Sequence, residues 1–167
     1  MKKIIVISFW GIWCIILYSV NQSNGQSRKE VPDKISFPDG YRNWTHIKSA
    51  INNPSFATHS GFHHIYANQK ALQGYQTGKF ADGAILVFDV LESIAQQNGD
   101  LIEGKRKLVD VMVKDSVKYI ETGGWGYEEF IYQGVSEIKT LHPSKTQCFS
   151  CHTSQKNNDF VFSKYRE

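Results

Sequence analysis

A C-x-x-C-H run near the C-terminal end constrains this chain more than any other feature of its sequence. Cys148, Cys151 and His152 form the run within the last twenty residues. The two thiols are about one helical turn apart, which suits their addition to the two vinyl groups of one porphyrin. The histidine that follows is the usual proximal ligand of haem iron. The run therefore predicts a covalently attached haem c, with thioether bonds at both cysteines and iron bound by His152.

Two other kinds of site share the C-x-x-C pattern, namely a redox-active dithiol and half of a zinc site. A zinc site needs four ligands, and the sequence has no second C-x-x-C pair. A thioredoxin-like pair would lie near the start of a helix that follows a strand, rather than close to the end of the chain. The pattern therefore favours haem c over both.

The first residues of the chain are typical of an export signal. Lys2 and Lys3 precede an apolar run of 17 residues at 4–20, and a polar patch follows at 21–27. We expect residues 1–25 to be a cleaved signal peptide. Because the run is at the short limit for a membrane span, an uncleaved anchor is the alternative. Either would place the rest of the chain in the periplasm, where haem c is attached.

The remainder of the chain is expected to form one domain of low charge. Residues 26–36 predict a linker, and residues 37–167 the haem domain. Loss of residues 1–25 lowers the formal net charge from +3 to +1. Such a domain gives no reason to expect nucleic acid or an anionic membrane as a partner. The short basic run at 105–107 is expected at a solvated junction between a loop and a strand.

Strands with a few short helices are expected between these ends. Four segments are rich in β-branched and aromatic residues: 62–67, 84–91, 107–113 and 128–132. The segment 84–91 is apolar on both faces except at Asp89, which suits a central strand. Short helices are expected at 68–78 and at 144–152, and residues 41–50 fit a helix or a strand. The predicted fold is α+β, mainly an antiparallel sheet, with the helix that carries the haem motif last.

The order of these elements separates the chain from two better-known kinds of haem protein. Small electron-transfer cytochromes c carry the motif early and supply an axial methionine later, whereas no methionine follows His152. The helical cytochromes c′ also carry the motif late, but they are four-helix bundles. This chain lacks the long apolar stripes that such a bundle needs.

Seven short segments resemble the cytochrome P-460 family and follow one another in the order of that family. They are YRNW (41–44), IYAN (65–68), TGKFADG (77–83), VKD (113–115), GWG (124–126), CFSCH (148–152) and VFSKY (161–165). The resemblance covers about residues 37–166. It implies a mainly antiparallel β fold with helices, a homodimer, and a haem c whose iron is typically five-coordinate with one open face.

The family that the chain resembles has two chemistries. Its hydroxylamine-oxidising members bond a lysine to the porphyrin edge, five residues after the glycine of a Phe-x-Asp-Gly turn. Counted from Gly83, this position holds Phe88, which cannot form the bond. The cytochrome c′-β branch lacks the bond, caps its distal face with phenylalanine and binds NO and CO. The resemblance therefore implies this branch, with Phe88 over the haem and Phe62 as a second cap.

Three more residues are candidates for the distal side. By the resemblance, Asp110 matches a proton-moving carboxylate; a salt bridge or an outward, exposed position is the alternative. His63 and His64 are adjacent on a strand and point to opposite faces. His63 matches a polar distal residue, with direct iron ligation or a structural role as alternatives. Met112 shares a face with Asp110 and is a further candidate axial ligand. Three histidines are expected at the surface or behind the pocket: His46, His59 and His142.

Three functions follow from these observations. The first is the binding of small gases (NO, CO) at an open distal site of an exported haem c protein. The second is oxidation of hydroxylamine or NO, which needs an open iron and a proton relay such as Asp110. The third is electron transfer to a small redox partner, with His63 or Met112 closing the iron. Because Phe88 replaces the cross-linking lysine, the sequence favours the first.

Overall fold

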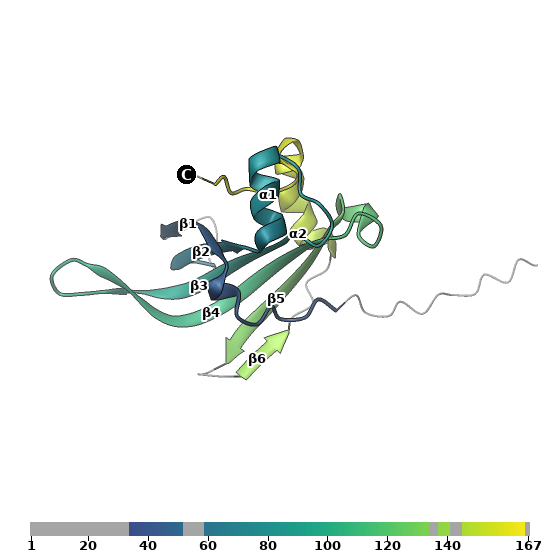
Figure 1. Cartoon of the computed structure of the whole chain (residues 1–167). Helices are drawn as coiled ribbons and strands as arrows, with labels where there is room; N and C mark the ends of the chain where they lie inside the picture. Colours follow the sequence, from purple (N-terminus) through teal and green to yellow (C-terminus); the bar gives the residue numbers. More distant parts are fainter. Residues whose placement is uncertain (1–33, 52–58, 134–136, 141–144, 166–167) are drawn as a thin grey trace, which may run out of the picture. The chain divides into compact units, whose positions relative to one another are not determined.

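Six antiparallel strands form one sheet in which spatial order follows chain order (Figure 1). The strands are β1 (Thr45–Ile51), β2 (Phe62–Ala67), β3 (Ile85–Ala95), β4 (Leu101–Lys114), β5 (Trp125–Gln133) and β6 (Glu137–Thr140). Each strand therefore pairs with its neighbours in sequence, and the connections can be short. With the helices described below, the sheet confirms the predicted α+β fold.

This computed structural model describes residues 34–51, 59–133, 137–140 and 145–165. The predicted export signal, most of the predicted linker and His142 lie outside these ranges. Within them, no helix has the length and apolar character needed to cross a membrane.

Two short α-helices lie on the same face of the sheet (Figure 1). Helix α1 (Gln69–Thr77) begins after Asn68, whose side chain accepts a hydrogen bond from the Ala71 amide at 2.9 Å. It ends at Gly78, where the left-handed backbone favours glycine. Helix α2 (Lys145–His152) carries the C-x-x-C-H run and continues into the 3₁₀ helix η3 (Thr153–Asn158). Both helices were predicted at these places.

Strand β4 is longer than the sequence predicted. It pairs with β3 out to Ala95 and Leu101, so the β3–β4 hairpin extends beyond the pairing of β3 with β2 (Figure 1). The basic residues 105–107 therefore lie inside a strand, and their expected place at a loop junction is wrong. Residues 41–50 form the 3₁₀ helix η1 (Tyr41–Asn43) followed by most of β1, which agrees with the strand alternative.

Apolar side chains cover both faces of the central strand β3, as predicted. On the helix side, Leu86 belongs to a buried cluster with residues of both helices. On the opposite side, Val87 and Val111 pack against Ile35 and Tyr41 from the segment before β1. Ile35, within the predicted linker, is thus part of the core.

Asp89 is the charged exception in this strand, and the protein compensates its burial with two arginines. Its side chain is fully buried. Arg42 donates to it through Nε at 2.9 Å and Nη2 at 2.7 Å, and Arg106 donates through Nε at 3.0 Å. A buried carboxylate is tolerated when it is paired and hydrogen-bonded in this way. The network also ties η1 to β3 and β4 on the face away from the helices.

Candidate functional site

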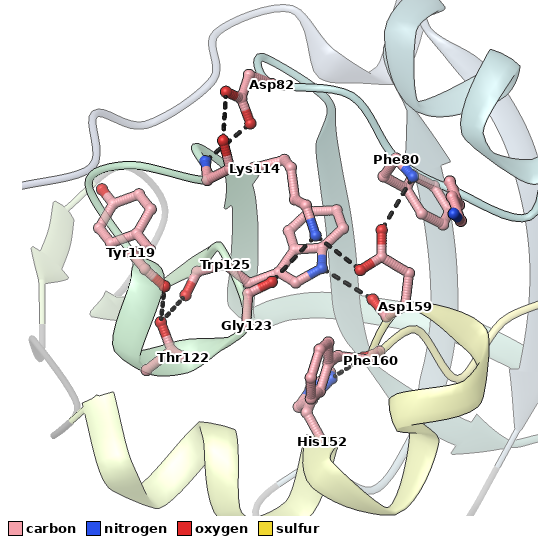
Figure 2. A network of polar contacts seen from close by, with 12 residues as sticks. Phe80, Asp82, Lys114, Tyr119, Thr122, Gly123, Trp125, His152, Asp159 and Phe160 are labelled. Carbon is pink, nitrogen blue, oxygen red and sulfur yellow. Dashed lines mark hydrogen bonds and ion pairs between the residues drawn. The ribbon is translucent and has the colours of Figure 1, made fainter.

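His152 stands at the end of α2 with one ring nitrogen already engaged. Its Nδ1 donates to the Phe160 carbonyl at 2.7 Å, so the lone pair is on Nε2 (Figure 2). The rings of Tyr127 and Phe162 flank the imidazole at centroid distances of 5.1 and 5.0 Å. Burial lowers the pKa of His152 and favours the neutral ring. A neutral imidazole oriented through Nδ1 is the form that binds a metal through Nε2.

The two cysteines of the run lie on the same helix and form no disulfide with each other. Cys148 is half-buried and packs against the cluster on the helix side of the sheet, whereas Cys151 is exposed. Burial raises the pKa of the Cys148 thiol to about 11. Helix α2 therefore presents two thiols and, directly after them, one imidazole.

The carbonyl that orients His152 belongs to a tightly held turn after η3. Asp159 and Phe160 both have left-handed backbones, with φ of 47° and 64°. Trp125 Nε1 donates to the Asp159 carbonyl at 2.8 Å, and the Asp159 carboxylate contacts Lys114 and the Phe80 amide (Figure 2). No role was expected for Asp159 or Lys114, although Lys114 lies within the segment VKD (113–115) and Asp159 just precedes the segment VFSKY (161–165), both of which carry the resemblance.

The candidate distal residues Phe88, Asp110 and His63 share the helix-side face of the sheet. Phe88 lies opposite Asp110 in the pairing of β3 with β4, and the His63 ring lies 4.9 Å from the Phe88 ring. His64 points to the other face, where it contacts Ser49 at 2.9 Å and Glu103 at 2.7 Å. The predicted opposite orientation of the two histidines is confirmed.

Asp110 is paired rather than isolated. His59 Nε2 lies 3.0 Å from Asp110 Oδ2 and 3.3 Å from Glu129 Oε2. Hydrogen bonds from His59 to Asp110 and Glu129 raise the pKa of His59 to about 9, so the imidazole is protonated at neutral pH. Burial raises the pKa of Asp110, and the His59 hydrogen bond lowers that of Glu129. Of the alternatives for Asp110, the structure agrees with the salt bridge.

The cluster of His59, Asp110 and Glu129 borders Phe88, because the His59 and Phe88 ring centroids are 6.2 Å apart. Sequence reasoning missed Glu129, although it alternates with Phe130 on β5 and lies opposite Asp110. His59 precedes β2 in the chain, and no pattern in the sequence linked it to Asp110.

The contacts of His63, Met112 and Phe62 bear on their expected roles as iron ligands or as a cap. His63 Nε2 donates to the His59 carbonyl, and burial lowers the pKa of His63. Met112 packs against the buried cluster on the helix side, opposite Tyr127 of β5. Phe62 stacks on His64 at 6.4 Å, because residues two apart on β2 point to the same face and His63, between them, points to the other. This placement corrects the expectation that Phe62 is a second cap beside Phe88.

The position that the cross-linking lysine would occupy, counted from Gly83, holds Phe88 on β3. Lys79 lies exposed on the loop before β3. Lys107 lies at an irregularity where Val90 pairs with Leu108 and Leu91 with Arg106, and its charge contributes to the lowered pKa of His63. Its Nζ donates to the Ser60 carbonyl at 2.7 Å.

A buried hydroxyl without a partner indicates whether the helix side of the sheet could accommodate a cofactor. Tyr127 Oη is buried and has no hydrogen-bond partner among the residues that the structure describes. Its ring is the one that flanks His152. Buried polar groups are almost always paired, so a polar group of a bound molecule would satisfy this one. Two thiols, an oriented imidazole and an orphan hydroxyl together suit a haem.

An antiparallel sheet whose last helix carries two thiols followed by an oriented histidine points to the class of haem-binding β proteins. The sequence model of one family, cytochrome P460, matches residues 38–163. The chain therefore belongs to the cytochrome P460 family, and this membership implies a haem cofactor with iron. A search of curated proteins found no match.

Proposed function

We propose that this protein is an exported c-type haem protein that binds small gases such as NO and CO. One observation carries the proposal. Phe88 stands where the hydroxylamine-oxidising members of the family have the cross-linking lysine, and it shares a sheet face with Asp110 and His63. When bound, the haem supplies an iron with one coordination position for a diatomic ligand. Cys148 and Cys151 would hold it as thioethers, and His152 would bind the iron through Nε2.

The distal residues would control access and polarity in this proposal. The Phe88 ring, bordered by His59 and His63, is an apolar group that excludes water from the open position. His63 Nε2 is engaged by the His59 carbonyl. This engagement argues against His63 as a sixth ligand, and so against an electron carrier closed by that residue.

A second candidate is oxidation of hydroxylamine or NO, and the His59–Asp110–Glu129 cluster favours it. An imidazolium held between two carboxylates can exchange protons with a nitrogenous ligand near Phe88. The lack of a lysine at position 88 argues against the cross-linked haem of the hydroxylamine-oxidising members.

The absorption spectrum of the purified ferrous protein, with and without CO, tests these candidates. A high-spin spectrum that converts on CO addition, with an ordinary haem c band in denaturant, is expected for the open, uncross-linked site. A broad red-shifted band that persists in denaturant would instead favour the enzyme. A low-spin spectrum that does not respond to CO would contradict both and leave electron transfer.

We further propose a periplasmic location and a homodimer. Fractionation and N-terminal sequencing of the mature protein test the location, and they separate a cleaved signal from an anchor.

For the homodimer, the β3–β4 hairpin offers the exposed side chains of Ile94, Leu101 and Ile102 as an interface. Leu101→Glu should then lower the mass found by light scattering. Val117→Glu, at another exposed apolar residue, is the matched control.

A further inference from the structure

Lys114, the last residue of β4, is a buried lysine that contacts the C-terminal turn. Its Nζ lies 2.7 Å from Asp159 Oδ1 and donates to the Gly123 carbonyl at 3.1 Å (Figure 2). The ammonium also lies 4.9 Å from the centroid of the Trp125 ring. A charge that is removed from water in this way is costly unless it is paired. The Lys114–Asp159 pair is therefore a specific feature of the fold rather than a chance surface contact.

Each of the three acceptor oxygens of Asp159 contacts a donor. Its Oδ1 contacts Lys114, its Oδ2 accepts from the Phe80 amide at 2.9 Å, and its carbonyl accepts from Trp125 Nε1 at 2.8 Å (Figure 2). These partners come from three separate parts of the chain. The residue is consequently fixed relative to β4, to β5 and to the loop after α1.

The next residue, Phe160, provides the carbonyl that orients His152. Both Asp159 and Phe160 adopt left-handed backbones, which are uncommon for residues other than glycine. The Phe160 ring fills the space that a Cβ on Gly123 would need, since that Cβ would be 2.3 Å from the ring. The Phe160 amide donates to the Gln155 carbonyl at 2.8 Å. Neighbouring groups thus impose this backbone and aim the Phe160 carbonyl at His152.

We propose that the Lys114–Asp159 ion pair is a positioning device that sets how strongly His152 donates to the iron. The inference rests on the proposed function, in which His152 binds the iron of haem c. A partner on the other ring nitrogen fixes the orientation of a ligating histidine and raises its basicity. Lys114 and Asp159 act through the Phe160 carbonyl and make no contact with the haem in this proposal.

The competing explanation is that the ion pair only closes the C-terminal turn. In that case its loss would lower stability without changing the bond between His152 and the iron. The test therefore needs a measurement of that bond in holoprotein. The iron–histidine stretching frequency of the ferrous protein and the reduction potential both report on it.

Lys114→Met removes the positive charge and keeps a side chain of similar length. Asp159→Asn removes the negative charge, and asparagine tolerates the left-handed backbone at this position. Both should lower the iron–histidine stretching frequency, raise the reduction potential and weaken the hold of His152 on the iron about tenfold. Lys114→Arg keeps the charge and should restore values near those of the wild type. Lys70→Met is the matched control, because Lys70 Nζ donates to the exposed Asp82 carbonyl at 3.0 Å.

Unchanged frequency and potential in both variants, with a lowered melting temperature, would overturn the inference and leave a structural role. If Lys114→Met does not accumulate as holoprotein, Asp159→Asn alone decides, because it retains the shape of the turn. A wild-type protein without an iron–histidine band would overturn the proposed function, and this inference with it. A wild-type band that does not shift in the variants would overturn the inference alone.

Discussion

The imidazole of His59 joins the carboxylates of two neighbouring strands, since its Nε2 lies 3.0 Å from Asp110 and 3.3 Å from Glu129. The two hydrogen bonds raise the pKa of His59 to about 9, from about 6.5 in an unfolded chain. A raised pKa means that the folded state binds the proton more tightly than the unfolded state does. The cluster therefore stabilises the fold through protonation of His59.

The stabilisation should be fully present below about pH 6.5 and should be lost as the pH rises through about 9. The shift corresponds to about 3 kcal/mol. We expect the free energy of unfolding of the wild type to fall over this interval by more than that of His59→Gln. Urea unfolding of holoprotein at a series of pH values measures the difference. His46→Gln is the control, and parallel curves for wild type and His59→Gln would contradict the prediction.

Asp89 should be among the least replaceable charges of the fold. Its fully buried carboxylate accepts from both Arg42 and Arg106, so Asp89→Asn would leave two guanidinium groups without their counter-ion. We expect a loss of about 3 kcal/mol in the free energy of unfolding. Denaturant unfolding measures it. Glu103→Gln breaks the exposed contact with His64 and should cost about 1 kcal/mol or less; equal losses in the two variants would refute the argument.

The elements that the sequence predicted well are those with strong local signals. The C-x-x-C-H helix, the glycine-terminated helix at 68–78 and the alternation around Asp110 rely on neighbouring residues, and all three were found. The Arg106–Asp89 pair depends instead on strand register. The basic run 105–107 carries no register information, which is why the sequence predicts for it only a solvated junction between a loop and a strand.

The site shows the same division. The resemblance is what suggests distal roles for Phe88, Asp110 and His63, and the strand pairing shows that the three share one face of the sheet. His59 and Glu129 join Asp110 through tertiary contacts across residues far apart in the chain. Phe62 does not lie beside Phe88 as a second cap. The resemblance was loose at this position, whereas strand alternation already puts Phe62 and His63 on opposite faces of the sheet.

Cys148→Ala should leave the haem attached by one thioether at most. One vinyl group then stays conjugated with the ring, and the alkaline pyridine spectrum of the ferrous haem should shift to longer wavelength. The yield of holoprotein should also fall, because the half-buried Cys148 packs into the core. Ser150→Ala, on the exposed side of the same helix, is the matched control. An unaltered spectrum and a full haem complement in Cys148→Ala would refute covalent attachment at this residue.

Phe88→Ala should open the proposed distal side. The ring borders those of His59 and His63 on the helix side of the sheet, where its loss should ease the approach of a ligand to the proposed haem. If displacing the ring contributes a little over 1 kcal/mol to the binding barrier, the CO association rate should rise about tenfold. Flash photolysis of the CO complex measures this rate.

Phe62→Ala is the matched control for Phe88→Ala, because it removes the same side chain from the same sheet on the face of His64. Each truncation is expected to cost stability, by up to about 3 kcal/mol for a well-packed phenylalanine. Only the Phe88 variant should change the CO association rate. Equal rate changes in the two variants would mean that general loosening, not removal of an apolar cap, controls access. An unchanged rate in Phe88→Ala would show that Phe88 does not face the ligand.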